Sequence, residues 1–409
     1  MMEETKVLHK KKVLAPKLRF KDFDDSWNQK KLNTLAEINP SNKNLPDKFI
    51  YIDLESVVKG ELLKENEILK DGAPSRAQRY LQQNDILFQM VRPYQMNNLY
   101  FDKKGNYVAS TGYAQIRTKE NSKYIYQYLH LQSFVDKVIE KCTGTSYPSI
   151  NSKDLGNIQI GIPSLPEQEK IAAFLTAVDE KIQQLNRKKQ LLEQYKKGLM
   201  QQLFSGKLRF KDENGKAYPK WEEKKLGEIT TLLKDGSHGT HVEDESSDYL
   251  LLSAKNIING TIKTDEAERR ISREDYNSIY KNYKLIENDI LLTIVGTIGR
   301  VAIFGNHSNI AFQRSVAFFR FENQDAKFMF QLMNGRQFQK ELEIRKVVSA
   351  QPGIYLGDLA KIKVHLPDIE EQKKIADFLS AIDNKINGVA AALEATTQFK
   401  KGLLQQMFV

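Results

Sequence analysis

The hexapeptide Lys17-Leu-Arg-Phe-Lys-Asp22 recurs without change as Lys207-Leu-Arg-Phe-Lys-Asp212, and the duplication that it marks runs through the 409-residue chain. Other landmarks recur with a constant shift of 204 residues: Asn84–Leu87 with Asn288–Leu291, Asp154-Leu155 with Asp358-Leu359, and Glu167-Gln168 with Glu371-Gln372. Residues 162–204 and 366–408 are identical at 20 of 43 positions, whereas the segments before them share only scattered landmarks. Two copies of one frame therefore carry two different modules, which predicts a pseudo-two-fold molecule and a ligand with two sub-sites.

Composition limits the class of protein. A chain that is 40% apolar and 28% charged is typical of a globular protein with a proper core. The net charge of +10, from 62 Lys and Arg against 52 Asp and Glu, favours a polyanionic partner, of which nucleic acid is the commonest. The single cysteine, Cys142, excludes an internal disulfide and a thiolate zinc cluster.

Targeting and membrane signals are weak in this sequence. The basic run Lys10-Lys11-Lys12 is followed by only three apolar residues before Pro16, too few for a signal-peptide core. No apolar stretch has the length of a bilayer span. Together with the single cysteine, these features predict a soluble cytoplasmic protein with no membrane partner.

Residues 167–204 predict one long helix, and the second copy predicts another. Their apolar residues advance by alternating steps of four and three: Ile171, Leu175, Val178, Ile182, Leu185, Leu192, Leu199 and Leu203, and Ile375, Leu379, Ile382, Ile386, Val389, Leu393, Leu403 and Met407. This 3.5-residue spacing is typical of a coiled-coil seam. The seam is interrupted at Lys189 and Lys196, and at Thr396 and Lys400.

A helix of ~38 residues is ~57 Å long, too long for one small domain to cover. We therefore expect the two seams to pair with each other, although two separate amphipathic helices remain an alternative. A second apolar strip would stay exposed for partner proteins; its aromatic members are Phe174, Tyr195, Phe378 and Phe399.

The segments before the helices predict α+β modules. Strands are expected at residues 50–54, 85–91, 249–252, 290–295 and 315–321, and helices at 124–141 and 326–346. The loops between them are rich in side chains that read base edges or hold phosphates. The candidate DNA-binding residues are Arg92, Tyr94, Gln95, Ser110, Thr111, Tyr113, Thr145 and Tyr147 in the first module, and Ser237, His238, Lys255, Asn256, Thr297, Arg300, Gln313, Arg314 and Gln351 in the second.

Several motifs together resemble those of type I restriction–modification specificity subunits. They are Leu165-Pro-Glu-Gln-Glu-Lys-Ile171 with the helix after it, Gly206–Trp221, Gly144-Thr-Ser-Tyr-Pro-Ser-Ile150, Val91-Arg-Pro-Tyr94 followed by Ser110–Tyr113, and Asp235-Gly-Ser-His238 followed by Leu252–Ile257. The resemblance covers nearly the whole chain from Lys17.

The resemblance implies two α/β target-recognition domains joined by two long helices that form an antiparallel coiled coil with pseudo-two-fold symmetry. The expected division is an N-terminal tail (1–16), a first recognition domain (17–164), a central helix (165–205), a second recognition domain (206–366) and a distal helix (367–409). The family binds a bipartite double-stranded DNA target, two methylation subunits and, in the full complex, restriction subunits. S-adenosylmethionine, ATP and Mg²⁺ would be used by those other subunits, with no cofactor on this chain.

No catalytic or metal site is expected. The sequence has no Gly-x-x-x-x-Gly-Lys-Ser/Thr phosphate loop. The Asn39-Pro40 pair lacks the following aromatic that an adenine-methylating motif needs, and His238 with His241 lacks a clear third metal ligand. Two alternatives remain open: a self-sufficient restriction or methylation enzyme, and a coiled-coil scaffold that does not bind DNA.

Overall fold

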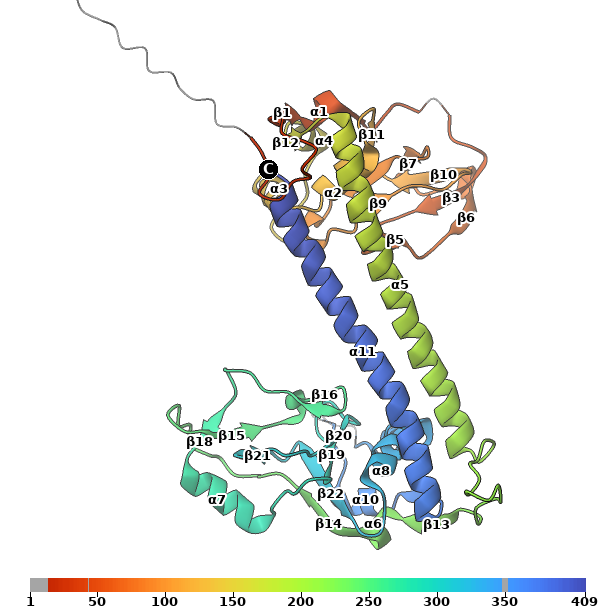
Figure 1. The fold of residues 1–409 in the computed structure, drawn as a ribbon, viewed down its shortest axis with the longest axis vertical. Coiled ribbons are helices and arrows are strands. Elements are labelled where there is room, and N and C mark those ends of the chain that lie inside the picture. Colours follow the sequence, from red (N-terminus) through yellow and green to blue (C-terminus); the bar gives the residue numbers. More distant parts are fainter. Residues whose placement is uncertain (1–13, 43, 348–351) are drawn as a thin grey trace, which may run out of the picture. The chain divides into compact units, whose positions relative to one another are not determined.

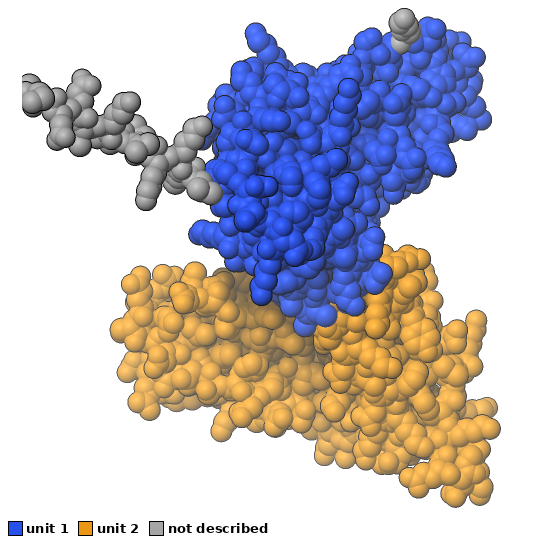
Figure 2. Space-filling view, turned by 45° about the horizontal axis from the view of Figure 1, so that its top comes forward, with its two compact units in different colours: residues 1–186, 391–409 blue, residues 187–390 orange. Residues whose placement is uncertain are grey.

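The computed structural model describes residues 14–42, 44–347 and 352–409. The chain divides into two compact units, one made of residues up to 186 together with 391–409 (unit 1), and the other of 187–390 (unit 2; Figure 2). The boundaries cut both long helices, so each unit contains one β-rich module and one end of each helix (Figure 1).

The long helices are α5 (Leu165–Phe204) and α11 (Ile369–Met407). In unit 1 the beginning of α5 lies against the end of α11, and in unit 2 the end of α5 lies against the beginning of α11. The prediction of two long helices pairing as an antiparallel coiled coil is therefore confirmed. No helix in the described parts of the chain has the length and apolar character that a bilayer crossing requires.

Unit 1 contains two four-stranded sheets, with strand orders β6-β3-β10-β7 and β2-β11-β8-β9. Strand β10 runs parallel to β3, and the other pairings in these sheets are antiparallel. The strands are β2 (Ala36–Ile38), β3 (Lys48–Ile52), β6 (Asn66–Leu69), β7 (Ala77–Tyr80), β8 (Ile86–Gln89), β9 (Leu99–Tyr100), β10 (Tyr107–Ser110) and β11 (Tyr113–Thr118). Two short pairs accompany them: β1 (Asn28–Lys31) with β12 (Gln159–Ile162), and β4 (Val57–Val58) with β5 (Glu61–Leu62).

Unit 2 repeats this plan with a smaller second sheet. Its sheets have the orders β14-β22-β19-β20 and β18-β15-β21, and β15 runs parallel to β21. The strands are β14 (Thr230–Asp235), β15 (Tyr249–Leu252), β18 (Arg270–Ile271), β19 (Ile290–Thr293), β20 (Val301–Ile303), β21 (Ile310–Phe312) and β22 (Val316–Phe321), with the pairs β13 (Glu222–Lys225)–β23 (Lys363–Leu366) and β16 (Ile257–Ile258)–β17 (Thr261–Ile262). Strand β18 leads into α7 (Arg273–Asn282), whereas β6 of unit 1 leads into one 3-10 turn, η1 (Lys70–Gly72). The five predicted strands are all present, with ends that move by no more than two residues.

The short helices correct one prediction. Residues 124–141 and 326–346 were each expected to form one helix, but each forms two: α2 (Ser122–Tyr128) and α3 (Gln132–Glu140), and α8 (Ala326–Met333) and α9 (Arg336–Arg345). The Asn334 side chain donates to the Phe330 carbonyl at 2.8 Å, and the next residue, Gly335, is extended. In unit 1, His130 Nδ1 lies 2.8 Å from the Tyr126 carbonyl in the same way. A side chain that binds a carbonyl of the last turn lets the helix end there. The remaining helices are α1 (Leu32–Leu35), α4 (Ser152–Gly156), α6 (Leu226–Ile229) and α10 (Leu356–Ala360).

Each core contains the ends of both long helices. In unit 1, Trp27 packs edge-to-face on Phe408, just beyond α11, and Leu175 of α5 lies in the same cluster. In unit 2, Trp221 and Phe204 of α5 both contact Phe328. The modules are thereby fixed to the helix ends through apolar packing, which is the main stabilising term in such interfaces.

Candidate DNA interface

Each module contains a buried aspartate that pairs with an arginine, and the two pairs lie at equivalent positions of the duplication. Arg117 binds the buried Asp85 through two hydrogen bonds of 2.8 and 2.7 Å, and Arg320 binds the buried Asp289 through two of 2.8 Å. These hydrogen bonds raise the pKa of both guanidinium groups. Both aspartates belong to the repeated Asn-Asp-Ile-Leu landmark, which could have identified them from the sequence, although their arginine partners could not be identified.

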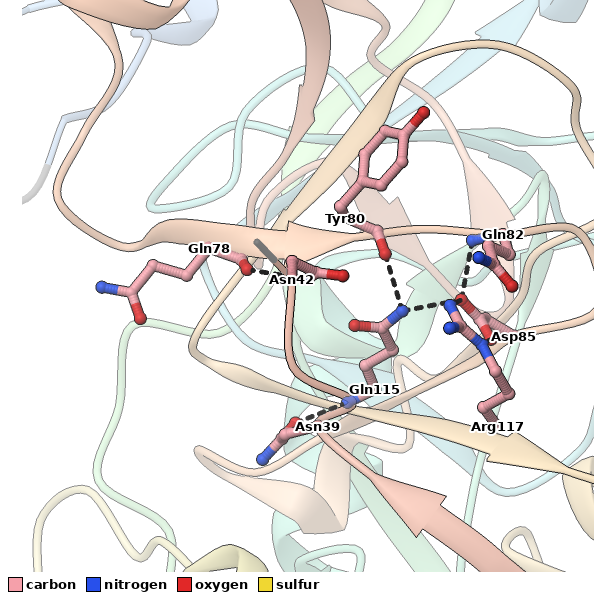
Figure 3. Close-up of polar contacts among 8 residues, drawn as sticks. All are labelled: Asn39, Asn42, Gln78, Tyr80, Gln82, Asp85, Gln115 and Arg117. Carbon is pink, nitrogen blue, oxygen red and sulfur yellow. Dashed lines mark hydrogen bonds and ion pairs between the residues drawn. The ribbon is translucent and has the colours of Figure 1, made fainter. Parts of the chain in front are cut away.

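Unit 1 adds a glutamine that joins its two sheets (Figure 3). Gln115 on β11 donates from Nε2 to the Tyr80 carbonyl of β7 at 2.8 Å and to Asp85 Oδ2 at 2.7 Å. Its backbone N–H donates to Asn39 Oδ1 at 2.9 Å. The strand register places Phe318 of unit 2 at the equivalent position, where it packs on Tyr283. The two modules therefore share an ion pair but differ in the core beside it.

Three candidate loops of unit 1 meet in what we call the first loop cluster, defined as residues 90–96, 110–112 and 143–149. The Met90 N–H donates to the Gly112 carbonyl at 2.9 Å, and the Arg92 N–H donates to the Pro148 carbonyl at 2.7 Å. These bonds bring together residues that are up to 56 positions apart in sequence.

The exposed part of the first loop cluster is aromatic and basic. The Arg92 guanidinium lies over the Tyr147 ring, 4.2 Å from its centroid, and Tyr147 is 64% exposed. Tyr94 is 52% exposed, and Thr145 is also exposed. Gln95 is exposed but accepts a hydrogen bond from Gln89 at 2.9 Å. Thr111 is half-buried at the edge of the cluster.

Three predicted contact residues are corrected to a supporting role because their side chains are buried. Tyr113 is fully buried, and burial raises the pKa of its hydroxyl. Ser110 is buried and accepts from the Gly112 N–H at 3.2 Å. Asn256, in unit 2, is buried and donates to Glu268 Oε1 at 2.6 Å. These groups hold the loops from inside and have no surface to offer a ligand.

Unit 2 has a second loop cluster, defined as residues 235–241, 252–256, 293–300 and 312–315. Ser315 joins three of these segments, because its carbonyl accepts from the Ile294 N–H at 2.9 Å and its Oγ from the Ala254 N–H at 3.0 Å. The Ser237 N–H donates to the Phe312 carbonyl at 2.8 Å and attaches the remaining segment.

Most predicted residues of the second loop cluster reach its surface. The His238 side chain is 64% exposed and lies 2.7 Å from Asp235, and Lys255 is equally exposed and pairs with Glu268 at 3.0 Å. The other members are Ser237 and Gln313, which are half-buried, and Thr297, Arg300 and Arg314, which are exposed. Gln351 lies outside the described residues.

The two clusters share one backbone framework. In unit 1, Ser149 forms isolated antiparallel β-bridges with both Val91 and Thr143. In unit 2, Gly353 forms the same β-bridges with Val295 and Val347, which lie 204 positions later. The Gly296 N–H donates to the Pro352 carbonyl at 3.0 Å, as Arg92 does to Pro148. Arg92 adopts the left-handed conformation (φ 54°) that Gly296 also adopts (φ 74°). A strained arginine thus occupies a position where glycine fits without strain.

Sequence reasoning missed two arginines beside the first loop cluster. The Arg76 carbonyl accepts from the Thr111 N–H at 2.8 Å, so the start of β7 adjoins the cluster. Arg79 is half-buried, and among the described residues it has no acidic partner within 4.0 Å. Burial lowers its pKa. The Arg-x-x-Arg spacing was the available signal, but nothing in the sequence placed it next to Thr111.

The histidines of residues 238–241 have separate surroundings. His238 contacts Asp235, whereas His241 contacts Ser237 and Asp275. Within the described segments, no three His, Cys, Asp or Glu side chains are grouped as metal ligands.

The predicted aromatic strip divides into two pairs. Phe20 packs edge-to-face on Phe174 and Phe210 on Phe378, so a phenylalanine of each repeated hexapeptide covers these positions. Tyr195 and Phe399 are each 56% exposed.

A family model described as "Type I restriction modification DNA specificity domain" matches residues 24–194 and 218–395. The type I restriction enzyme MjaVIII specificity subunit of Methanocaldococcus jannaschii is 29% identical over 359 residues, which cover 83% of each chain. The EcoBI specificity subunit of Escherichia coli is 25% identical over 307 residues, covering 68% of this chain and 64% of that one. The crystal structure of the type I restriction–modification S subunit from M. genitalium superimposes with a TM-score of 0.60 at 16% identity, over 97% of this chain and 99% of that one. This last similarity concerns the fold.

Proposed function

The chain belongs to the family of type I restriction–modification DNA specificity domains, and from this premise we propose how its two loop clusters divide a DNA target between them. It is the non-catalytic specificity subunit of a type I restriction–modification complex and binds a bipartite DNA sequence, one half-site for each recognition domain. The first loop cluster would read one half-site and the second loop cluster the other.

One observation carries this proposal: the same hydrogen-bond framework presents different side chains in the two units. Arg92 and Gly296 occupy equivalent positions with equivalent backbone bonds. A shared framework allows each module to meet a duplex in the same way, while the exposed side chains differ and can select different bases.

The exposed residues suit these roles. Arginine donates two hydrogen bonds to guanine in the major groove, and the stack on Tyr147 holds the Arg92 guanidinium in one plane before DNA arrives. In unit 2, Arg300 and Arg314 supply charge, and Thr297 supplies a short hydroxyl group. Arg79 would complete the first cluster as a phosphate contact, since it pairs with Ala109, next to Ser110, and no acidic partner among the described residues neutralises its charge.

The family works with methylation and restriction subunits and with DNA. We propose further that two methylation subunits bind along the paired helices, with Tyr195 and Phe399 in the contacts. The complex would use S-adenosylmethionine, ATP and Mg²⁺ through those subunits, with no cofactor on this chain, and would work in the cytoplasm on the cell's own DNA.

The testing experiment is a methylated-base map of genomic DNA from cells that carry this chain with its methylation subunits. A bipartite motif is expected. Replacing residues 25–160 by another recognition module should change one half of that motif and leave the other half unchanged. The matched control replaces residues 218–360 and should change only the other half.

A map with no motif, or a swap that alters both halves together, would contradict the division of labour proposed here. Methylation or cleavage by the purified chain alone would favour a self-sufficient enzyme instead. Electrophoretic mobility shifts across a salt series test DNA binding directly, because phosphate contacts weaken steeply as salt rises.

A further inference from the structure

A largely buried histidine lies behind the exposed residues 238–240 of the second loop cluster. The His241 side chain is 10% exposed, and its Nε2 lies 2.7 Å from Ser237 Oγ. Its Nδ1 lies 3.3 Å from Asp275 Oδ1 in the first turn of α7. Three polar side chains therefore connect the loop to a helix at the side of the unit.

The hydrogen bonds around His241 fit one arrangement of protons. The Gly239 N–H donates to Ser237 Oγ at 3.2 Å, so the Ser237 hydroxyl proton is free to be donated to Nε2. The other ring nitrogen, Nδ1, faces the Asp275 carboxylate without an aligned hydrogen bond. The negative charge favours a proton on Nδ1, which leaves Nε2 as the acceptor.

The backbone on both sides of this group is also fixed. The Ser237 N–H donates to the Phe312 carbonyl at 2.8 Å, and the Ser237 carbonyl accepts from the Arg314 N–H at 3.0 Å. A Cβ on Gly236 would clash with the Phe312 carbonyl oxygen, so the loop packs directly on the neighbouring backbone. The Arg269 guanidinium donates to the His241 carbonyl. Residues 238–240 are thus the part of this segment that faces solvent.

This support is particular to unit 2. Asp275 belongs to α7, and in unit 1 the chain after β6 forms only the turn η1. The first loop cluster has the Arg92–Tyr147 stack instead. A change at His241 should therefore affect one domain alone.

We propose that His241 is a positioning residue for DNA recognition by unit 2: through Ser237 and Asp275 it holds residues 237–240 in the conformation that meets the DNA. This inference rests on the proposed function and names a residue on which the accuracy of one half-site depends, although His241 itself does not touch the DNA.

The test uses the chain assembled with its methylation subunits, and the readout is the methylated-base map of host genomic DNA. His241→Ala should relax base preference by about tenfold, the value of one hydrogen bond, in the half-motif read by unit 2 only. His241→Gln places an amide oxygen where Nε2 was and should restore the preference, whereas the shorter Asn should not. Ser237→Ala should match His241→Ala, and the double variant should be no worse than either.

An unchanged map for His241→Ala would overturn the inference, as would a Gln variant that is as relaxed as the Ala variant. Equal relaxation of both halves would also overturn it, because that pattern indicates a general loss of folding. Folding of His241→Ala is checked by Trp221 fluorescence in a Trp27→Phe background. If this variant does not fold, Ser237→Ala and His241→Gln still test the inference. A native complex with no bipartite motif would refute the proposed function itself, whereas a native motif that survives all these variants would refute only the role of His241.

Discussion

Lys196 on α5 donates to Asp383 on α11 through hydrogen bonds of 2.6 and 2.8 Å. The residues 204 positions away make the same contact in unit 1, where Lys400 Nζ lies 2.6 Å from Asp179. Each aspartate also accepts from a glutamine of its module, Gln331 at 2.7 Å or Gln127 at 2.6 Å. The apolar seam is therefore interrupted at Lys196 and Lys400 because, in each unit, this lysine and the facing aspartate connect the two long helices to the module.

Asp383→Ala should lower the stability of unit 2 by about 1–3 kcal/mol, because it leaves Lys196 and Gln331 partly buried without their acceptor. Denaturant unfolding followed by Trp221 fluorescence in a Trp27→Phe background measures this loss. Asp179→Ala is the matched variant and should act on unit 1, as Trp27 fluorescence reports. A loss of the same size when Lys196 is already alanine would show that the pair does not interact.

Each repeated hexapeptide contributes an arginine to a buried glutamate. Arg19 binds Glu167 and Arg209 binds Glu371, and both glutamates are at most 1% exposed. The Trp221 indole N–H also donates to Glu371 at 3.1 Å, whereas the Trp27 indole nitrogen has no partner among the described residues.

Arg19→Ala should therefore destabilise unit 1 by about 3 kcal/mol or more, since it leaves a buried carboxylate unpaired. Arg209→Ala should cost less in unit 2, where Trp221 still donates to the carboxylate. Amide hydrogen exchange measures the free energy of opening of each unit, and so compares the two losses of stability. Equal losses in the two units would show that the indole contributes nothing.

Arg92→Ala should weaken binding to one half-site by ~1–3 kcal/mol if the guanidinium meets a guanine. Tyr147→Leu should produce a smaller loss at the same position, because it removes only the stack that orients Arg92. Competition binding with duplexes altered in one half at a time measures both effects. If Arg92→Ala leaves every base preference intact, Arg92 is no base contact.

His130 gives unit 1 a pH dependence with no counterpart at the equivalent position of unit 2, which is Asn334. Burial, followed by the charge of Lys400, lowers the pKa of His130 to about 4. The unfolded chain binds a proton near pH 6.5 and the folded chain only near pH 4, so stability is complete above pH 6.5 and falls as pH drops toward 4. The expected loss is about 2 kcal/mol, less than the full pKa difference implies, since His130 as a residue is only half-buried.

The matched variant is His130→Asn, which places in unit 1 the residue that unit 2 has at position 334. Asn keeps a donor for the Tyr126 carbonyl and does not titrate. As pH falls from 7 to 4, the wild-type chain should therefore lose stability relative to the variant. Urea midpoints followed by Trp27 fluorescence in a Trp221→Phe background measure it. A constant difference across that range would rule out the titration.

Tyr195→Ser with Phe399→Ser should weaken assembly with methylation subunits without changing stability, because both rings are more than half exposed. Size-exclusion chromatography of the mixed proteins tests this. Phe174→Ser with Phe378→Ser is the contrasting pair and should destabilise the units, since Phe20 and Phe210 pack on these rings. If the Tyr195→Ser, Phe399→Ser variant assembles as well as the wild-type chain, these two rings do not lie in the interface.

The sequence by itself determined the duplication, the two long helices and the family. These properties are written in local patterns: a repeated hexapeptide, a 3.5-residue spacing, and prolines and acids at helix starts. Loop positions were predicted for the same reason, because glycine, proline and serine mark turns wherever the chain is later placed.

Only the tertiary structure decided which loop residues can touch a ligand. Tyr113, Ser110 and Asn256 look like surface residues in the sequence, but packing within the folded modules buries them. Arg117, Lys196 and Asp275 contact Asp85, Asp383 and His241 from 32, 187 and 34 residues away, and no local pattern records such a distance. Burial and long-range pairing arise when sheets and helices pack, so they belong to the fold as a whole and not to any one segment.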